Sequence, residues 1–182
     1  MILFLNGPFG VGKTSVSKVL VEKIPNAMLY DPEVIGSILQ RVPVQLKKVD
    51  DFQDYALWHT LVVEVARLLR KASARPLVIP LTVWRRDYFD SITARLRRVD
   101  PDLACFRLTA SDDVLVRRIL SDSQDKEAYA WRMSHVEVCI AASRDPAFGV
   151  EVWTDGRTPA GVADAILETL KDVSADKLEG KV

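Results

Sequence analysis

The chain has 182 residues, of which 48% are hydrophobic and 27% are charged. This length and composition predict one soluble domain, residues 1–182, with a core of its own. Lysine plus arginine equals aspartate plus glutamate at 25 each, so the formal net charge is zero. A balanced charge gives no indication of a general affinity for nucleic acid or for anionic membranes.

The apolar segments and the cysteines indicate a cytoplasmic protein. No stretch of about 18 apolar residues occurs, so no membrane-spanning helix is expected. The N-terminal apolar run has no basic region before it and therefore does not resemble a signal peptide. Cys105 and Cys139 are too few for a disulfide framework and have no metal-ligand spacing, which is typical of reduced thiols. The sequence leaves the oligomeric state open.

In chain order, short apolar runs alternate with longer segments of helical spacing. Such runs predict strands that are buried on both faces. The alternation predicts a five-stranded parallel sheet with helices on both faces, which is a three-layer α/β fold. The predicted strands are residues 2–5, 27–30, 77–81, 104–108 and 150–153. The predicted helices are 13–24, 32–41, 54–73, 86–98, 111–121, 126–143 and 158–173, with polar loops at 43–53 and 121–126 and a flexible tail at 174–182.

The first predicted strand leads into a glycine-rich segment, Gly7 to Thr14, which fits the phosphate-binding pattern G-x-x-x-x-G-K-[ST]. Its glycines let the backbone wrap around phosphate oxygens, and the following helix adds the positive end of its dipole. Lys13 supplies a charge for the β- and γ-phosphates of ATP, and Thr14 supplies a hydroxyl for Mg²⁺. The predicted nucleotide contacts in this segment are Gly7, Gly10, Val11, Gly12, Lys13, Thr14 and Ser15.

Asp31 follows the second predicted strand and has two interpretations. The carboxyl ends of neighbouring parallel strands converge on the phosphate site, where a carboxylate can accept a proton from an attacking hydroxyl or hold a Mg²⁺-bound water. Alternatively, Asp31, Pro32 and Glu33 are the cap and first turn of a helix. Both roles can be combined in one residue.

Two later strand ends also carry polar side chains. Pro80 cannot donate to a strand ladder, so the third strand is expected to end there, which places Thr82 at the ligand-binding edge of the sheet. No acid ends this strand to hold Mg²⁺ through water, and Asp31 is the expected substitute. Arg85 is a candidate contact for an anionic acceptor. Residues 154–159, after the fifth strand, are interpreted as a turn that borders the nucleotide only through its position.

Two arginines belong to the predicted fifth and sixth helices. Leu115 and Ile119 lie four residues apart and are expected to face the core together. Arg118 projects beside that face, where its flat guanidinium can lie against a nucleobase. Arg132, beyond the polar loop, can reach phosphate oxygens when a lid of about residues 115–133 closes. The alternative is that both arginines are solvated helix charges.

Residues 51–59 open the predicted third helix with aromatic and amide side chains, which suit a sugar or nucleobase acceptor. The alternative is a core face, because apolar residues recur at helical spacing from Leu57 to Ala72. Trp58 fits either interpretation. The candidate acceptor contacts of the whole chain are Asp31, Phe52, Gln53, Tyr55, Trp58, Thr82 and Arg85.

Together these segments resemble the tunicamycin-resistance ATP-binding proteins. The resemblance covers residues 1–155, and its more specific parts are Asp51-Phe52-Gln53 and Ile79-Pro80-Leu81-Thr82. The segments that carry it are 6–14, 30–33, 50–55, 57–58, 78–83 and 88–89.

The resemblance implies a fold like that of nucleoside and nucleoside-monophosphate kinases, with ATP bound at Gly12, Lys13 and Thr14. It also implies protection from tunicamycin, a uracil-containing nucleoside antibiotic with sugars and an acyl chain. In similar kinases the arginine of a Leu-x-x-Arg segment covers the adenine, which corresponds to Leu115 and Arg118. A second lid arginine is common four residues later, but Asp122 stands there in this chain, and Arg132 is the expected substitute. Membrane attachment, which some relatives are thought to use, is not expected from the short polar tail.

Three hypotheses follow. In the first, the protein is a kinase: Asp31 activates a tunicamycin hydroxyl, while Lys13, Arg118 and Arg132 stabilise the transferring phosphoryl group. In the second, an ATP-dependent protein sequesters the drug without chemistry, in keeping with the missing strand-end acid. In the third, a housekeeping kinase acts on a nucleoside or a sugar and resistance is incidental.

Overall fold

The structure is a computed structural model that describes residues 1–41, 49–121 and 126–179. Its centre is a parallel five-stranded sheet with the strand order β2-β3-β1-β4-β5. The strands are β1 (Ile2–Asn6), β2 (Met28–Leu29), β3 (Leu77–Pro80), β4 (Leu103–Thr109) and β5 (Val150–Trp153).

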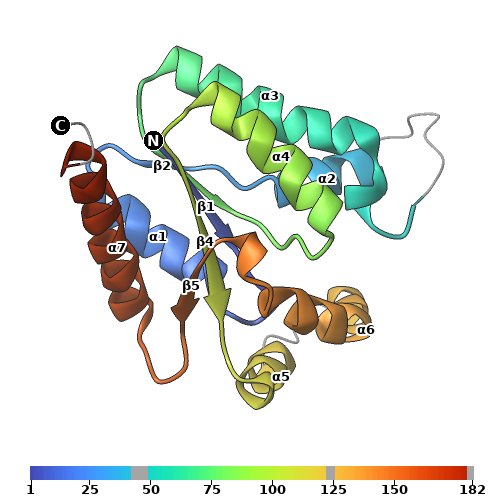
Figure 1. The fold of residues 1–182 in the computed structure, drawn as a ribbon. Helices are drawn as coiled ribbons and strands as arrows, with labels where there is room; N and C mark the ends of the chain where they lie inside the picture. Colours follow the sequence, from blue (N-terminus) through green and yellow to red (C-terminus); the bar gives the residue numbers. More distant parts are fainter. Residues whose placement is uncertain (42–48, 122–125, 180–182) are drawn as a thin grey trace.

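Helices cover both faces of this sheet (Figure 1). One face packs against α1 and α7 and the other against α3 and α4, while α5 and α6 lie beyond the carboxyl ends of the strands. This arrangement confirms the predicted three-layer α/β fold. The described helices are α1 (Lys13–Lys23), α2 (Glu33–Arg41), α3 (Ala56–Ala72), α4 (Arg86–Val99), α5 (Asp112–Ser121), α6 (Lys126–Ser143) and α7 (Pro159–Glu179), with short 3-10 turns η1 (Phe52–Asp54) and η2 (Pro146–Phe148).

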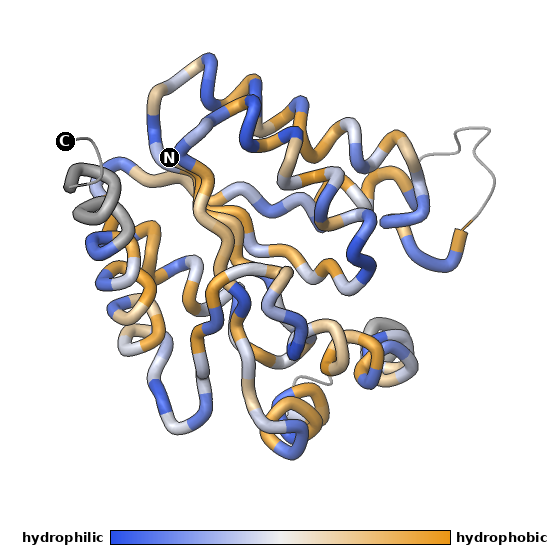
Figure 2. Tube along the Cα trace, in the orientation of Figure 1, coloured by the Kyte–Doolittle hydropathy of each residue, from blue (hydrophilic) through white to orange (hydrophobic). Residues whose placement is uncertain are grey.

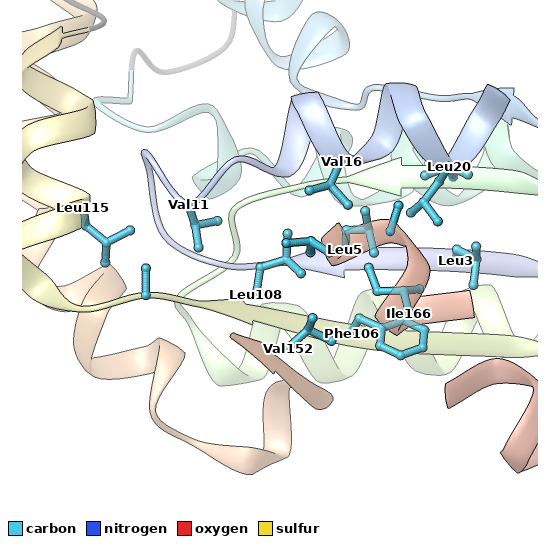
Figure 3. Packing of buried hydrophobic residues seen from close by; sticks show 14 of the residues in the cluster. Leu3, Leu5, Val11, Val16, Leu20, Phe106, Leu108, Leu115, Val152 and Ile166 are labelled. Atoms are coloured by element: carbon cyan, nitrogen blue, oxygen red, sulfur yellow. The ribbon is translucent and has the colours of Figure 1, made fainter. Parts of the chain in front are cut away.

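Alternate side chains of each inner strand pack into two separate cores, one on each face of the sheet. Leu3 and Leu5 of β1 face the core beneath α1 and α7 (Figure 3), whereas Ile2 and Phe4 face the core beneath α3 and α4. All four side chains are fully buried. Because helices cover both faces of the sheet, the inner strands have continuous apolar sequences instead of alternating apolar and polar residues. Figure 2 shows the complementary pattern on the helices, where hydrophobic and hydrophilic segments alternate along α3, α4 and α7.

Several element boundaries differ from the predicted ones. The third helix begins at Ala56, not at residue 54, because Asp51 caps η1 by accepting a hydrogen bond from the Gln53 backbone N–H. The last helix continues to Glu179 instead of ending at residue 173, and the first glycine after residue 173 is Gly180. The predicted loops and tail fall partly outside the described residues, at 42–48, 122–125 and 180–182. Among the described helices, none is long and apolar enough to span a membrane.

The carboxyl ends of β1 and β3 are held together by one side chain. β3 ends at Pro80, as predicted, and the chain then runs alongside the end of β1. The buried Asn6 amide donates to the Val83 carbonyl at 2.9 Å and accepts from the Val83 N–H at 2.9 Å. This pair of hydrogen bonds fixes the segment after β3 against the start of the glycine-rich loop.

Replacing Asn6 by alanine should therefore be strongly destabilising. The change leaves a buried donor and a buried acceptor without partners, so we expect a loss of about 2–4 kcal/mol of unfolding free energy, measured by urea denaturation. Thr60→Ala is the matched control, since Thr60 is exposed on α3 and bonds only to its own helix, and we expect a change within about 0.5 kcal/mol. Equal midpoints for the two variants would contradict the role assigned to Asn6.

Candidate active site

A cleft of about 640 Å³ lies at the carboxyl end of the sheet. Its floor is the glycine-rich loop and the first turn of α1, which contribute residues 9–16. Glu33 and Thr82 line the cleft from the segments after β2 and β3, while Arg118 and Arg132 line it from α5 and α6. The edge of an open α/β sheet where strand ends converge is the usual ligand-binding position of such folds.

The glycine-rich loop has a backbone that only glycine adopts readily. Gly10 and Gly12 have φ angles of 75° and 97°, in the left-handed region. A Cβ at Gly10 would lie 2.9 Å from the Leu115 carbonyl oxygen, so the loop also packs closely against α5. The N-terminus of α1 opens into the cleft, with Thr14 and Ser15 exposed there. Backbone amides and a helix dipole directed at a cavity favour a bound phosphate.

Lys13 is held inside this loop. Its Nζ donates to the carbonyl oxygens of Gly7 and Pro8, at 2.9 Å each. Burial lowers the pKa of Lys13 from 10.5 to about 8, although Glu33 and Asp31 nearby oppose the shift. An anionic phosphate in the cleft would restore the charge that burial disfavours.

Glu33 is the site residue that the sequence analysis missed, because it was interpreted only as part of a helix start. Its side chain is open to the cleft, yet the surrounding protein raises its pKa by desolvation. Lys13 and Arg132 attract the carboxylate, and a hydrogen bond from the Thr82 backbone N–H also favours its charged form. A carboxylate four residues after β2 therefore reaches the segment that follows β3, where the sequence has no acid.

Asp31 has the capping role that was one of its two interpretations. Its Oδ1 accepts a hydrogen bond of 2.9 Å from the Glu33 backbone N–H, which satisfies a free donor at the start of α2. Asp31 lies beside the cleft, within electrostatic reach of Lys13, but Glu33 is the carboxylate in the lining. The structure thus places two neighbouring carboxylates, Asp31 and Glu33, at this strand end.

Arg118 connects the loop to the segment after β5. It donates to the carbonyl oxygens of Gly10 and Val11 at 3.4 Å and to the Thr154 hydroxyl at 3.2 Å. Thr154 and Arg157 line the same cleft, so the turn after β5 contributes more than its turn signal predicted. Asp122, the residue at the usual second lid position, lies outside the described residues.

Several predicted acceptor contacts do not belong to the lining of the cleft. Trp58 is fully buried in the core, and its indole N–H donates to the Pro32 carbonyl at 3.1 Å. Gln53 is buried as well, with its amide donating to the Thr82 carbonyl at 3.0 Å. The half-buried Phe52 packs on Trp58 with ring centroids 5.3 Å apart, and Tyr55 is buried nearby.

Arg85 does not line the cleft, whereas Thr82 does. The exposed guanidinium of Arg85 pairs with Asp54 at 3.5 Å and with Asp87 at 3.0 Å, and it lies over the Tyr88 ring. Thr82 is buried and belongs to the cleft lining, as its place at the strand end predicted. The structure thus brings together Lys13, Thr14, Thr82, Arg118 and Arg132 with Glu33.

No protein-family model matches this sequence, and no curated protein sequence matches it either. Solved structures do match. The tunicamycin resistance protein of Deinococcus radiodurans is 21% identical, with a TM-score of 0.73 over 93% of this chain and 95% of that one. A gluconokinase from Sinorhizobium meliloti 1021 is 19% identical, with a TM-score of 0.67 over 99% and 97% of the two chains. Shikimate kinase from Acinetobacter baumannii is 17% identical, with a TM-score of 0.56 over 94% and 93%.

These similarities define the fold class: the chain has the phosphate-loop kinase-like fold, a five-stranded parallel sheet flanked by helices. Within this class, the solved structures that it resembles include the tunicamycin resistance protein, in agreement with the resemblance of the sequence motifs. At these identities the similarity establishes the fold alone, because one fold can carry many different chemistries.

The burial of Lys13 should make the unfolding free energy of the protein depend on pH. Between pH 8 and pH 10.5 the unfolded chain binds more protons at this position than the folded chain, so the cost of burying the charged Lys13 disappears as the pH rises. The unfolding free energy of wild type relative to Lys13→Ala should therefore rise by about 2–3 kcal/mol over this range. Urea denaturation in the absence of nucleotide measures the difference. Lys18→Ala, at an exposed position on α1, should show no such change, and a flat difference for Lys13→Ala would contradict the prediction.

Proposed function

We propose that the protein binds ATP and transfers its γ-phosphoryl group to a hydroxyl of tunicamycin or a similar nucleoside. The observation that carries this proposal is the Glu33 carboxylate in the cleft, close enough to Lys13 and Arg132 for attraction and hydrogen-bonded by Thr82. A cationic phosphate site with a carboxylate beside it has the groups that phosphoryl transfer needs: charge to stabilise the phosphoryl and a base for the hydroxyl.

In the proposed mechanism, the glycine-rich loop and Lys13 hold the β- and γ-phosphates. Arg118 and Arg132 approach from α5 and α6, which we propose as a lid of about residues 115–133, and stabilise the transferring group. The acceptor oxygen attacks the γ-phosphorus while its proton passes to the Glu33 carboxylate. The bond from the γ-phosphorus to the bridging oxygen then breaks and releases ADP. A raised pKa makes Glu33 a better proton acceptor than an ordinary surface glutamate.

The donor groups in the cleft also fit Mg²⁺, which prefers oxygen ligands from one or two side chains together with phosphates. Thr14 is exposed at the start of α1 and would supply a hydroxyl, while Glu33 or Asp31 would hold a Mg²⁺-bound water. When bound, Mg²⁺ neutralises charge on the phosphates. With Glu33 in the cleft, this arrangement does not need an acid at the end of β3.

The first test is mass spectrometry of tunicamycin after incubation with the protein, ATP and Mg²⁺. We expect a mass gain of one phosphoryl group, with equal release of ADP, and no gain with Lys13→Ala because the phosphates lose their main cation. Unmodified drug that still binds in an ATP-dependent manner would instead favour sequestration. A nucleoside or sugar that accepts phosphate faster than tunicamycin would favour a housekeeping kinase.

A second prediction separates the two carboxylates. Glu33→Gln keeps the shape of the side chain but removes the base, so we expect kcat to fall by about 100-fold or more while ATP affinity changes little. Asp31→Asn retains an oxygen that can cap α2, and we expect a fall of less than about tenfold. Glu22→Gln, at an exposed position on α1, is the control. The assignment of the base to Glu33 fails if Asp31→Asn proves the more damaging change.

A further inference from the structure

Four aromatic side chains from three separate elements gather beside the cleft. Phe9 belongs to the glycine-rich loop, Trp84 follows β3, and Trp131 and His135 lie on α6. The rings of Trp131 and His135 stack with centroids 4.5 Å apart, and Trp84 lies 6.0 Å from Trp131 and 5.5 Å from His135. Phe9 lies 5.5 Å from Trp131 and 6.3 Å from Trp84. We call these four residues the aromatic wall.

The two tryptophans of the aromatic wall lie outside the hydrophobic core clusters of the described residues. α6 packs into the core through residues such as Met133 and Val136, whereas Trp131 and His135 are one helical turn apart at other positions. Trp84 and Trp131 are half-buried and belong to neither of the two core clusters of the described residues. Large aromatic rings that are partly exposed beside a cleft are typical of ligand-binding surfaces.

The aromatic wall meets the cleft at Phe9. Phe9 itself lines the cleft, and Trp131 directly precedes Arg132, which also lines it. Trp84 comes two residues after Thr82, another lining residue, and the Asn6 hydrogen bonds fix the segment between them. The wall therefore adjoins, through Phe9, the cavity that Lys13 and Glu33 line.

Carboxylates are close to this wall. Asp51 is buried, and burial raises its pKa to about 6, while His135 and Glu33 both lie within electrostatic reach of it. Its Oδ1 accepts from the Gln53 backbone N–H at 2.9 Å. Glu33 lines the cleft, where a carboxylate accepts hydrogen bonds from hydroxyl groups and repels other carboxylates, so the cleft beside Glu33 favours an uncharged polyol over an acid.

We infer that the aromatic wall is the acceptor subsite, and that it selects an uncharged, ring-bearing acceptor whose sugar or base ring stacks on Trp84 and Trp131. This inference rests on the proposed function, because it assumes that the cleft holds both ATP and an acceptor. It adds the specificity: the ring face is bound by the wall, hydroxyl groups face Glu33, and an acceptor with a carboxylate is rejected.

The test is calorimetric titration of the full chain, loaded with Mg²⁺ and a non-hydrolysable ATP analogue, with three probes. Tunicamycin and uridine carry an uncharged ring, and uridine 5′-carboxylate is the matched acid. We expect uridine to bind at least tenfold more tightly than its 5′-carboxylate. Trp131→Leu and Trp84→Leu should each weaken tunicamycin binding by about tenfold through the loss of stacking, whereas Trp131→Phe, which keeps a ring, should lose about threefold or less.

Trp153→Leu is the control, because Trp153 is exposed on the edge strand β5 and takes no part in the aromatic wall. Affinity for the ATP analogue should be the same in all variants, which also verifies that each is folded. Unchanged tunicamycin affinity in Trp131→Leu, tighter binding of the carboxylate probe, or no binding of either ring-bearing probe at millimolar concentration would each overturn the inference.

The two proposals can fail separately. If tunicamycin binds through the wall but is never phosphorylated, the kinase proposal fails and the acceptor subsite stands. If tunicamycin is phosphorylated equally well by wild type, Trp84→Leu and Trp131→Leu, the kinase stands and the aromatic wall is not its acceptor subsite.

Discussion

The whole arrangement depends on β1 being paired on both edges and covered on both faces. Parallel pairing with β3 and β4 aligns the carboxyl ends of the three strands, and fully buried side chains from Ile2 to Leu5 hold that register from two cores. A slip of one residue would exchange the two faces of the strand. Because the register is fixed, the glycine-rich loop, Thr82 and the start of α5 meet at one edge, and the Asn6 hydrogen bonds to Val83 tie two of these segments directly.

The cleft at this edge is electrostatically divided. Lys13, Arg118, Arg132 and Arg157 line it, and the first turn of α1 adds the positive end of a helix dipole. Glu33 lies between these two parts of the cleft, since Lys13 and Arg132 attract its carboxylate while desolvation by the surrounding protein raises its pKa. Under the proposed function, such a division would hold the phosphate charge on one side and leave a proton acceptor on the other. The buried lysine lowers stability when no anion is present, a cost that a bound phosphate removes.

The aromatic residues divide between structural and exposed roles according to which elements cover them. Trp58 belongs to the first turn of α3 and is fully buried. Its indole N–H donates to the Pro32 carbonyl, just before α2. Together with Gln53, it supports the peptide segments that present Glu33 and Thr82. Trp84 and Trp131 are half-buried, belong to neither core cluster of the described residues and lie with their ring centroids 6.0 Å apart. Residues of one chemical type thus serve as scaffold in one place and as a candidate binding surface in another.

The sequence by itself determined the glycine-rich loop, the five strands, the end of β3 at Pro80 and the three-layer fold, because these follow from local patterns: glycine spacing, apolar runs and the missing N–H of proline. Only the tertiary structure decided which side chains enter the cleft. Helical spacing shows that α3 has a buried face but not what covers it, so it left Trp58 undecided. Glu33 meets Thr82 from another strand, and the aromatic wall joins residues 9, 84, 131 and 135. Contacts between positions so distant in the chain depend on packing, which no local pattern records.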